Sequence, residues 1–151
     1  MTTRHPRRGE KNRKDYRYIS EKSFKRGIKK GNFLEWERNF GYLYGTPKRF
    51  VLEKIKQGKS LLLSIDVKGT MVVKRKFPES VLIFVKPPSV KELSHRLKAR
   101  KTDRKIEIAK RLAMAKNELA YALKYDHIVL NNRLKNAVDD VVAIIKKERG
   151  K

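Results

Sequence analysis

From residue 60 onward, short apolar runs of strand length alternate with longer stretches of helical periodicity. We expect strands at 60–66, 81–85 and 127–131, and helices at 89–100, 105–125 and 134–147. Because parallel strands need a crossover between them, usually a helix, this alternation predicts a parallel sheet in an α/β domain. The chain has 151 residues and no cysteine, so we expect one domain whose stability does not depend on disulfides.

The first 58 residues have a different pattern of expected elements. The sequence predicts a short strand at 16–19, a helix at 21–30, paired strands at 33–40 and 42–44, and a second helix that ends near residue 57. Ser20 is a suitable N-cap for the first helix, and Gly31 is a suitable residue to end it. Thr46 and Pro47 are expected to cap and open the second helix.

Two arginines flank a proline close to the start of the chain, in the run TTRHPRRGE. Guanidinium groups match phosphate oxygens with forked donors, and Pro6 stiffens the turn between Arg4 and Arg7, so the two side chains form a candidate phosphate clamp. Tyr16 and Tyr44 are expected to donate their hydroxyls to the same phosphate. Taken singly, a strand tyrosine more often serves packing, and it is the combination that indicates a nucleotide phosphate.

A single acidic residue, Glu35, lies in an apolar run between Leu34 and Trp36. A buried carboxylate is costly unless it is paired, and guanine presents two adjacent donors, its N1–H and its exocyclic amine. Adenine lacks this pair, so Glu35 is expected to select guanine, with Thr46 as a further hydrogen-bond partner of the base. The other interpretation places Glu35 on the polar face of a strand, without a ligand.

The chain is strongly basic, with 40 Lys and Arg against 16 Asp and Glu and a formal net charge of +24. Such an excess can indicate nucleic-acid binding, because it neutralises phosphates and releases counterions. The basic residues are spread along the whole chain, however, which favours a solvated surface on a protein with anionic substrates, and nucleic acid is not an expected partner. We expect no membrane span and a cytoplasmic location. The three histidines are not spaced as metal ligands, so no residue is assigned to a metal.

The motifs TTRxPRxGE, DY, FLEW and YGT of the first 46 residues resemble those of the guanylate kinase family. The resemblance continues in IDxxG at 65–69, PPSxxxLxxRLxxR at 87–100 and RLxxAxxEL at 111–119. It implies the parallel sheet and helices of a P-loop nucleoside monophosphate kinase, with a small GMP-binding subdomain and a lid. It also implies phosphoryl transfer from ATP to GMP, giving ADP and GDP with Mg²⁺, although Ser64 stands where the family usually has an aspartate near the metal.

The same resemblance implies roles for individual residues outside the phosphate clamp. Asp66 is expected to contact guanine, and Asn131 to lie near the adenine of ATP. Arg96, Arg100 and Arg111 are expected to act as catalytic residues of a mobile lid that closes over the triphosphate.

The loop that holds ATP phosphates in such kinases, G-x-x-x-x-G-K-[ST], follows a strand and opens a helix. Gly58-Lys59-Ser60 is the only Gly-Lys-Ser in the sequence, but residue 53 is Glu and the predicted order is helix, then strand. We therefore expect that Met1 is an internal methionine of a longer chain that carries the loop. This polypeptide alone would then be inactive or impaired.

On this interpretation the chain is one N-terminally truncated guanylate kinase-like domain. Residues 1–58 would be mainly the GMP-binding subdomain, 59–99 and 126–151 the core, and 100–125 the lid and the helix after it. Two other functions remain open. A non-catalytic guanylate kinase-like module would use the clamp to bind GMP or a phosphorylated partner, and a basic RNA-associated protein would use the net charge instead.

Overall fold

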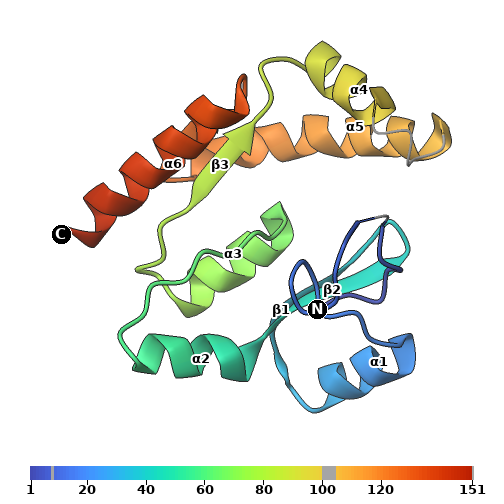
Figure 1. Ribbon diagram of the computed structural model, residues 1–151, viewed down its shortest axis with the longest axis vertical. Helices are drawn as coiled ribbons and strands as arrows, with labels where there is room; N and C mark the ends of the chain where they lie inside the picture. Colours follow the sequence, from blue (N-terminus) through green and yellow to red (C-terminus); the bar gives the residue numbers. More distant parts are fainter. Residues whose placement is uncertain (8, 100–104, 151) are drawn as a thin grey trace. The chain divides into compact units, whose positions relative to one another are not determined.

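The computed structural model describes residues 1–7, 9–99 and 105–150, so the predicted lid residue Arg100 lies outside the described residues. The chain forms two compact units, Met1–Pro78 and Glu79–Lys151, which we call unit 1 and unit 2 and describe separately. Figure 1 shows their elements coloured along the sequence.

Unit 1 is an antiparallel hairpin with helices packed on both of its faces. Its elements are α1 (Glu21–Lys29), β1 (Phe33–Asn39), β2 (Tyr42–Pro47), α2 (Lys48–Lys56) and α3 (Val67–Lys76). Two neighbouring residues of β1 show how the faces are covered. Phe33 stacks on Phe24 of α1, whereas Leu34 packs with Val51 of α2 and Val73 of α3.

The local sequence sets the ends of α1 as predicted. The Ser20 hydroxyl accepts a hydrogen bond from the amide of Ser23 at 3.2 Å, and Gly31 takes a left-handed φ of +63° just after the helix. The predictions of this helix and of the hairpin after it are confirmed. The capping role expected for Thr46 is wrong, because Thr46 stays in β2 and Pro47 is the N-cap of α2.

Two predicted strands of unit 1 are absent from the described structure. Residues 16–19 form only single bridges, at Tyr16 and Tyr18. Residues 60–66 are not a strand either. Leu63 packs against the Leu34 cluster while Leu62 is 72% exposed, so the alternation expected of a strand is present. Alternation alone gives no ladder, because a strand also needs a neighbour to exchange backbone hydrogen bonds with.

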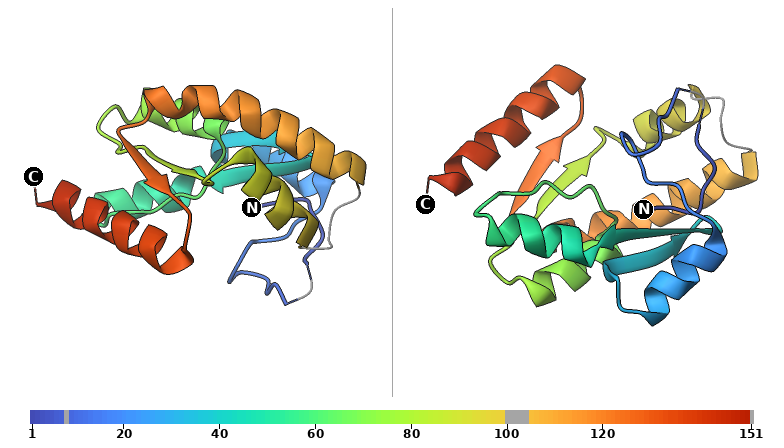
Figure 2. Two further views of the ribbon diagram at one scale, coloured as in Figure 1. Left: turned by 90° about the horizontal axis from the view of Figure 1, so that it is seen from above. Right: turned by 60° about the horizontal axis from the view of Figure 1, so that its bottom comes forward.

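Unit 2 contains a two-stranded parallel sheet and three α-helices among its described residues. Its elements are β3 (Ile83–Lys86), α4 (Val90–Ala99), α5 (Lys105–Leu119), the 3-10 helix η1 (Ala120–Lys124), β4 (His127–Leu130) and α6 (Leu134–Arg149). Ile83 lies opposite His127 and Lys86 opposite Leu130, and Figure 2 shows the two strands side by side. The structure thus confirms a parallel pair with helical crossovers but not the third strand at 60–66. Among the described helices, none has the length and apolar character needed to cross a membrane.

Candidate functional site

The first residues of the chain lie between two other segments of unit 1. The amide of Thr2 donates to the carbonyl of Arg17, and the amide of Thr3 donates to the carbonyl of Leu43, each at 3.0 Å. Thr2 forms single bridges to Tyr18 on one side and to Tyr44 of β2 on the other, and is fully buried. This arrangement places Arg4, two residues later, beside the tyrosines that the sequence grouped with it.

Arg4 is the centre of a polar and aromatic cluster. One terminal nitrogen of its guanidinium, Nη2, donates to both carboxylate oxygens of Glu10 at 2.9 Å, and Nη1 donates to the carbonyl of His5 at 2.7 Å. The guanidinium carbon lies 5.6 Å from the ring centre of Tyr16 and 5.9 Å from that of Tyr18. The Arg4 side chain is only 11% exposed, so contacts on several sides fix its charge in position.

Glu10 is the residue that holds Arg4, and our sequence reasoning did not assign it to the site. It also accepts a hydrogen bond from the Tyr18 hydroxyl at 2.8 Å and one from the amide of Arg7 at 2.7 Å. These donors, Arg4 first, lower the pKa of Glu10 to about 2, and the bond to Glu10 raises the pKa of Arg4. The available signal was that Glu10 is one of few acidic residues in a basic segment, six residues from Arg4.

A tight turn joins Arg7 to Glu10. The amide of Glu10 donates to the carbonyl of Arg7 at 3.0 Å, and Gly9 between them has a φ of +89°, which glycine adopts without strain. The Arg7 side chain is exposed. Of the two arginines of the predicted clamp, Arg4 is therefore held in place by its contacts, whereas the side chain of Arg7 is exposed to solvent.

The two predicted hydroxyl donors also meet at this cluster. The rings of Tyr16 and Tyr44 are 6.1 Å apart in an edge-to-face arrangement, and Tyr44 lies opposite Glu37 in the hairpin register. Arg4, Tyr16 and Tyr44, which lie as much as 40 residues apart in the sequence, are thus brought together. They place the Arg4 guanidinium beside two phenol side chains, and guanidinium groups are strong hydrogen-bond donors to phosphate.

The predicted base-recognition residues form a second group in unit 1. Glu35 is 7% exposed, and its Oε1 accepts a hydrogen bond from the hydroxyl of Thr46, directly opposite in the register, at 2.5 Å. Burial raises the pKa of Glu35 and the nearby charge of Asp66 adds to the effect, while hydrogen bonds from Thr46 act in the opposite direction. None of the ion pairs between described residues includes Glu35.

An irregularity in β1 accounts for the position of this carboxylate. The register shifts between Phe33 and Glu35, so Leu34 is the extra residue of a bulge. Both Leu34 and Glu35 consequently lie beside α3, Leu34 against Val73 and Glu35 against Gly69. Without the bulge, strict alternation would send one of the two to the opposite face.

Asp66 has a structural role that the sequence did not reveal. It is the N-cap of α3, and its Oδ1 accepts a hydrogen bond from the amide of Gly69 at 2.8 Å. The cap holds the start of α3 against Glu35, so Asp66 and Glu35 do lie close together, as the expected guanine site requires.

The predicted ATP-side residues lie in unit 2. Arg96 of α4 donates to Glu92 at 2.7 Å and to the backbone carbonyls of Asn131 and Asn132 at 2.8 and 3.0 Å. Arg96 therefore ties α4 to the segment after β4, and it contacts Asn131 through the main chain. Arg111 is half-buried on α5.

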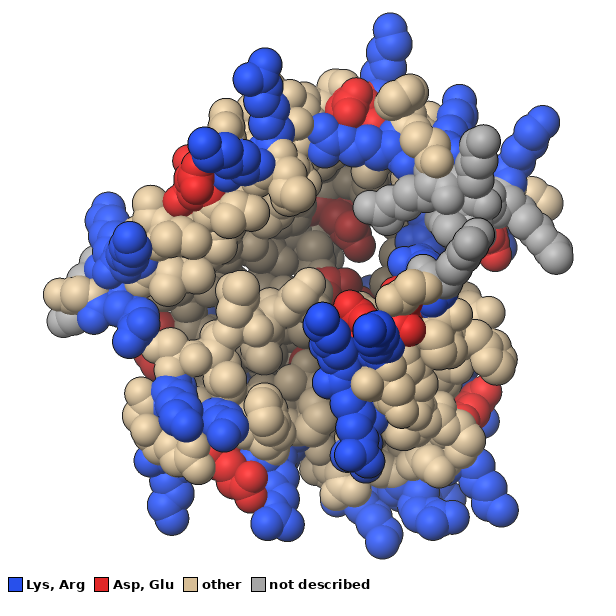
Figure 3. Space-filling model, in the orientation of Figure 1, with Lys and Arg blue, Asp and Glu red and all other residues tan. Residues whose placement is uncertain are grey.

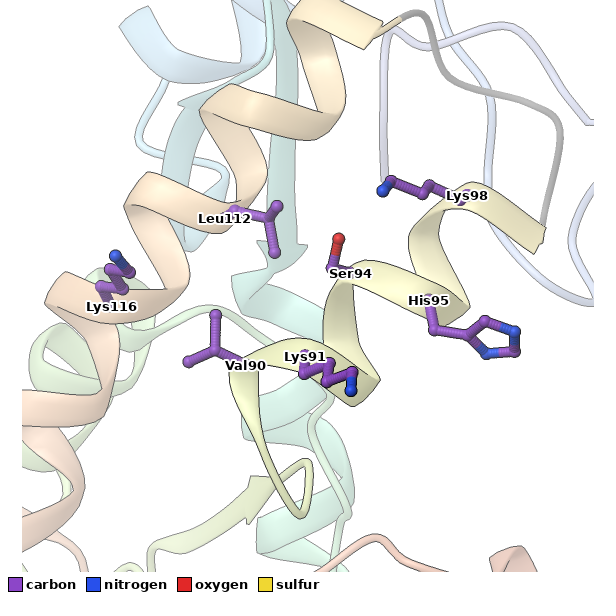
Figure 4. A pocket seen from close by; sticks show the side chains of 7 residues that line it. All are labelled: Val90, Lys91, Ser94, His95, Lys98, Leu112 and Lys116. Atoms are coloured by element: carbon purple, nitrogen blue, oxygen red, sulfur yellow. The ribbon is translucent and has the colours of Figure 1, made fainter.

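A shallow pocket of about 470 Å³ lies between α4 and α5. In Figure 4, Ser94 and Leu112 line the space between the helices, whereas the side chains of Lys91 and His95 point away from α5. On the face shown in Figure 3, Lys and Arg side chains are spread out rather than gathered in one patch. Among the described residues, no three His, Asp or Glu side chains gather as cation ligands, and we assign none to magnesium.

Comparison with known proteins shows to which family the chain is similar. A sequence model described as guanylate kinase matches residues 1–148. A guanylate kinase of Caldanaerobacter subterraneus subsp. tengcongensis is 46% identical over 148 residues, which are 98% of this chain and 72% of the relative. One from Aster yellows witches'-broom phytoplasma is 44% identical over 151 residues, 99% of this chain and 72% of the relative. The crystal structure of guanylate kinase from Anaplasma phagocytophilum matches with a TM-score of 0.85 and 31% identity, covering 99% of this chain and 73% of that one. The chain therefore belongs to the guanylate kinase family.

Proposed function

We propose that this protein is a guanylate kinase, which transfers a phosphoryl group from ATP to GMP and gives ADP and GDP, and that unit 1 forms its GMP site. In this proposal Glu35 accepts hydrogen bonds from the N1–H and the exocyclic amine of guanine. Thr46 and Asp66 complete the base site, and Arg4, Arg7, Tyr16 and Tyr44 bind the phosphate.

One observation carries the proposal: the two groups lie along the same strand. Arg4, Tyr16 and Tyr44 form what we call the phosphate cluster. Tyr44 thus belongs to this cluster, and Thr46 holds Glu35. Residues two apart in a strand point to the same face and lie about 7 Å apart along it. A nucleotide lying along β2 can therefore reach a fixed cation at one end and a buried carboxylate at the other.

The chemistry expected of these residues is positioning and charge stabilisation. In phosphoryl transfer the protein mainly aligns the two nucleotides and stabilises charge on the transferred group. Glu10 and the tyrosine rings hold Arg4 before any ligand is bound, so little side-chain freedom is lost when a phosphate binds. Arg96, Arg100 and Arg111 would act on the triphosphate and Asn131 near its adenine, and we expect Mg²⁺ to be bound chiefly by the phosphates of ATP.

A second candidate function is a module that binds GMP without transferring phosphate to it. The observation in its favour is that every residue proposed to bind GMP lies in unit 1, whereas the residues assigned to ATP lie in unit 2. The loop G-x-x-x-x-G-K-[ST] would have to hold the ATP phosphates. In the structure Gly58-Lys59-Ser60 follows α2 and leads into residues 61–66, which form neither a helix nor a strand, so this run does not have the strand-loop-helix setting of a phosphate-binding loop.

A coupled assay for GDP formation from GMP and ATP, run on the full-length gene product beside GMP binding by the same preparation, separates the candidates. The kinase proposal expects GDP formation that is lost in Glu35→Ala. Binding of GMP without GDP formation would favour the binding module. A third candidate, a basic RNA-associated protein, predicts instead RNA affinity that falls steeply with salt and is indifferent to Glu35.

A further inference from the structure

In its observed orientation the Glu35 carboxylate occupies the place of a side chain at residue 69, near the start of α3. Gly69 is the third residue of α3 and is buried. A Cβ built on Gly69 would lie 2.8 Å from Oε2 of Glu35, 3.2 Å from its Cδ and 3.3 Å from Oδ1 of Asp66. The first of these distances is shorter than a van der Waals contact, so the carboxylate occupies the space that a side chain at residue 69 would need.

Neither backbone conformation nor helix stability explains a glycine at this position. The φ of Gly69 is not in the left-handed region, and glycine is a poor helix former. The backbone amide of another residue at position 69 would donate the same hydrogen bond to Asp66. What remains is the absence of a side chain, which leaves room for the carboxylate.

The two ends of the Glu35 carboxylate are thus fixed from opposite directions. Oε1 accepts the hydroxyl hydrogen bond of Thr46, and Oε2 lies over the bare backbone of Gly69. The atoms that a Cβ at residue 69 would meet first are the carboxylate oxygen and carbon at the end of the Glu35 side chain, not backbone atoms. The chain could therefore accommodate it by rotating Glu35, at the expense of the bond to Thr46.

We propose that Gly69 is a positioning residue for guanine recognition: the bare surface of α3 at residue 69 sets the plane in which Glu35 presents its carboxylate. This inference rests on the proposed function, because it takes guanine as the ligand of Glu35. Gly69 itself does not contact the nucleotide in this account. Its role is to leave the carboxylate in the one orientation that accepts both purine donors.

The first arm of the test measures binding of GMP and IMP to wild-type and Gly69→Ala chains by calorimetry. IMP keeps the N1–H but lacks the exocyclic amine, so the ratio of the two affinities reports the orientation of the carboxylate. We expect Gly69→Ala to weaken GMP binding at least tenfold and to reduce the preference for GMP over IMP. Lys68 is an exposed neighbour in the same helical turn, so Lys68→Ala is the matched control. It should keep the wild-type affinity for GMP and the wild-type preference for GMP over IMP.

The second arm is a double-mutant cycle of urea unfolding with Gly69→Ala and Glu35→Ala, which needs no ligand. In the wild-type background the new methyl group displaces Glu35. In the Glu35→Ala background only the 3.3 Å approach to Oδ1 of Asp66 remains, and the methyl group improves the helix. We therefore expect Gly69→Ala to raise the urea midpoint only when Glu35 is absent.

The outcomes separate the two proposals. Wild-type affinity of Gly69→Ala for GMP, or additive effects in the cycle, would overturn the role of Gly69 and leave the proposed function standing. A wild-type chain that does not prefer GMP to IMP would overturn the proposed function, and the role of Gly69 with it. An equal loss of GMP and IMP binding would indicate a general structural defect, and would also overturn the inference.

Discussion

Replacing Glu35 by alanine should abolish guanine recognition while leaving the phosphate cluster in place. Glu35 is 7% exposed, and its Oε1 accepts a hydrogen bond from the hydroxyl of Thr46. Hydrogen bonds to a charged acceptor contribute about 1.5–3 kcal/mol each. Losing two of them, with part regained from water, should cost about 3 kcal/mol, or roughly a 10²-fold weaker affinity for GMP.

The chain offers both a reporter and a matched control for this experiment. Trp36 is its only tryptophan, lies next to Glu35 and is 46% exposed, so its fluorescence can follow a GMP titration. Glu37 lies two residues along β1 and pairs with Lys68 at 3.2 Å, so Glu37→Ala makes the same change outside the base site. GMP affinity should fall in Glu35→Ala and be kept in Glu37→Ala. Equal affinities of wild-type and Glu35→Ala chains would refute the reasoning.

Glu35→Gln should weaken GMP binding without lowering the stability of the fold. Burial raises the pKa of Glu35 above its ordinary value of 4.5, so its contribution to stability is complete below that value and is lost as the pH rises through the folded-state pKa. At pH 7 Glu35→Gln should therefore be at least as stable as the wild type in urea unfolding, yet bind GMP more weakly. A clear loss of stability at pH 7 would contradict this account of the buried charge.

Three further predictions concern the arginines and their partners. In calorimetry, Arg4→Ala should weaken GMP binding about 10- to 100-fold but leave guanosine binding unchanged. The control Arg49→Ala on α2 should change neither affinity. Equal losses of affinity for GMP and guanosine would exclude a phosphate-specific role. Because the pKa of Glu10 is lowered from 4.5 to about 2, urea unfolding should show wild-type stability falling between these pH values, and Glu10→Gln should lack that part of the fall. Arg96→Ala should lower the unfolding free energy by about 1 kcal/mol, a value discounted for the 31% exposure of the side chain. It should also speed hydrogen exchange of the backbone amides around Asn131. Unchanged exchange would show that the hydrogen bonds of Arg96 do not hold this segment.

Features that depend on neighbours in the sequence were predictable. Ser20 caps α1 through an amide three residues away, and Gly31 ends the helix through its own φ. The β1–β2 hairpin follows from two runs separated by a glycine turn. In each case the interaction that decides the structure lies within a few residues of the signal.

Features that depend on residues far away in the sequence could not be predicted from local patterns. The run at 60–66 has the alternation of a strand but no pairing neighbour among the described residues. The helix α3 was missed because its start combines β-branched residues with a glycine, all weak helix formers, and is held by the cap of Asp66 and by packing on β1. Likewise, the ion pair between Arg4 and Glu10 depends on the backbone turn from Arg7 to Glu10, which sequence spacing does not predict.

The central claim is that unit 1 binds a guanine nucleotide through Glu35 and the Arg4 cluster. The most direct test is calorimetric titration of this chain with GMP and with AMP, at the same salt concentration and pH. The account predicts that GMP binds at least tenfold more tightly, because only guanine offers two donors to the carboxylate. Equal affinities for the two nucleotides, or no binding of GMP by folded protein, would contradict it.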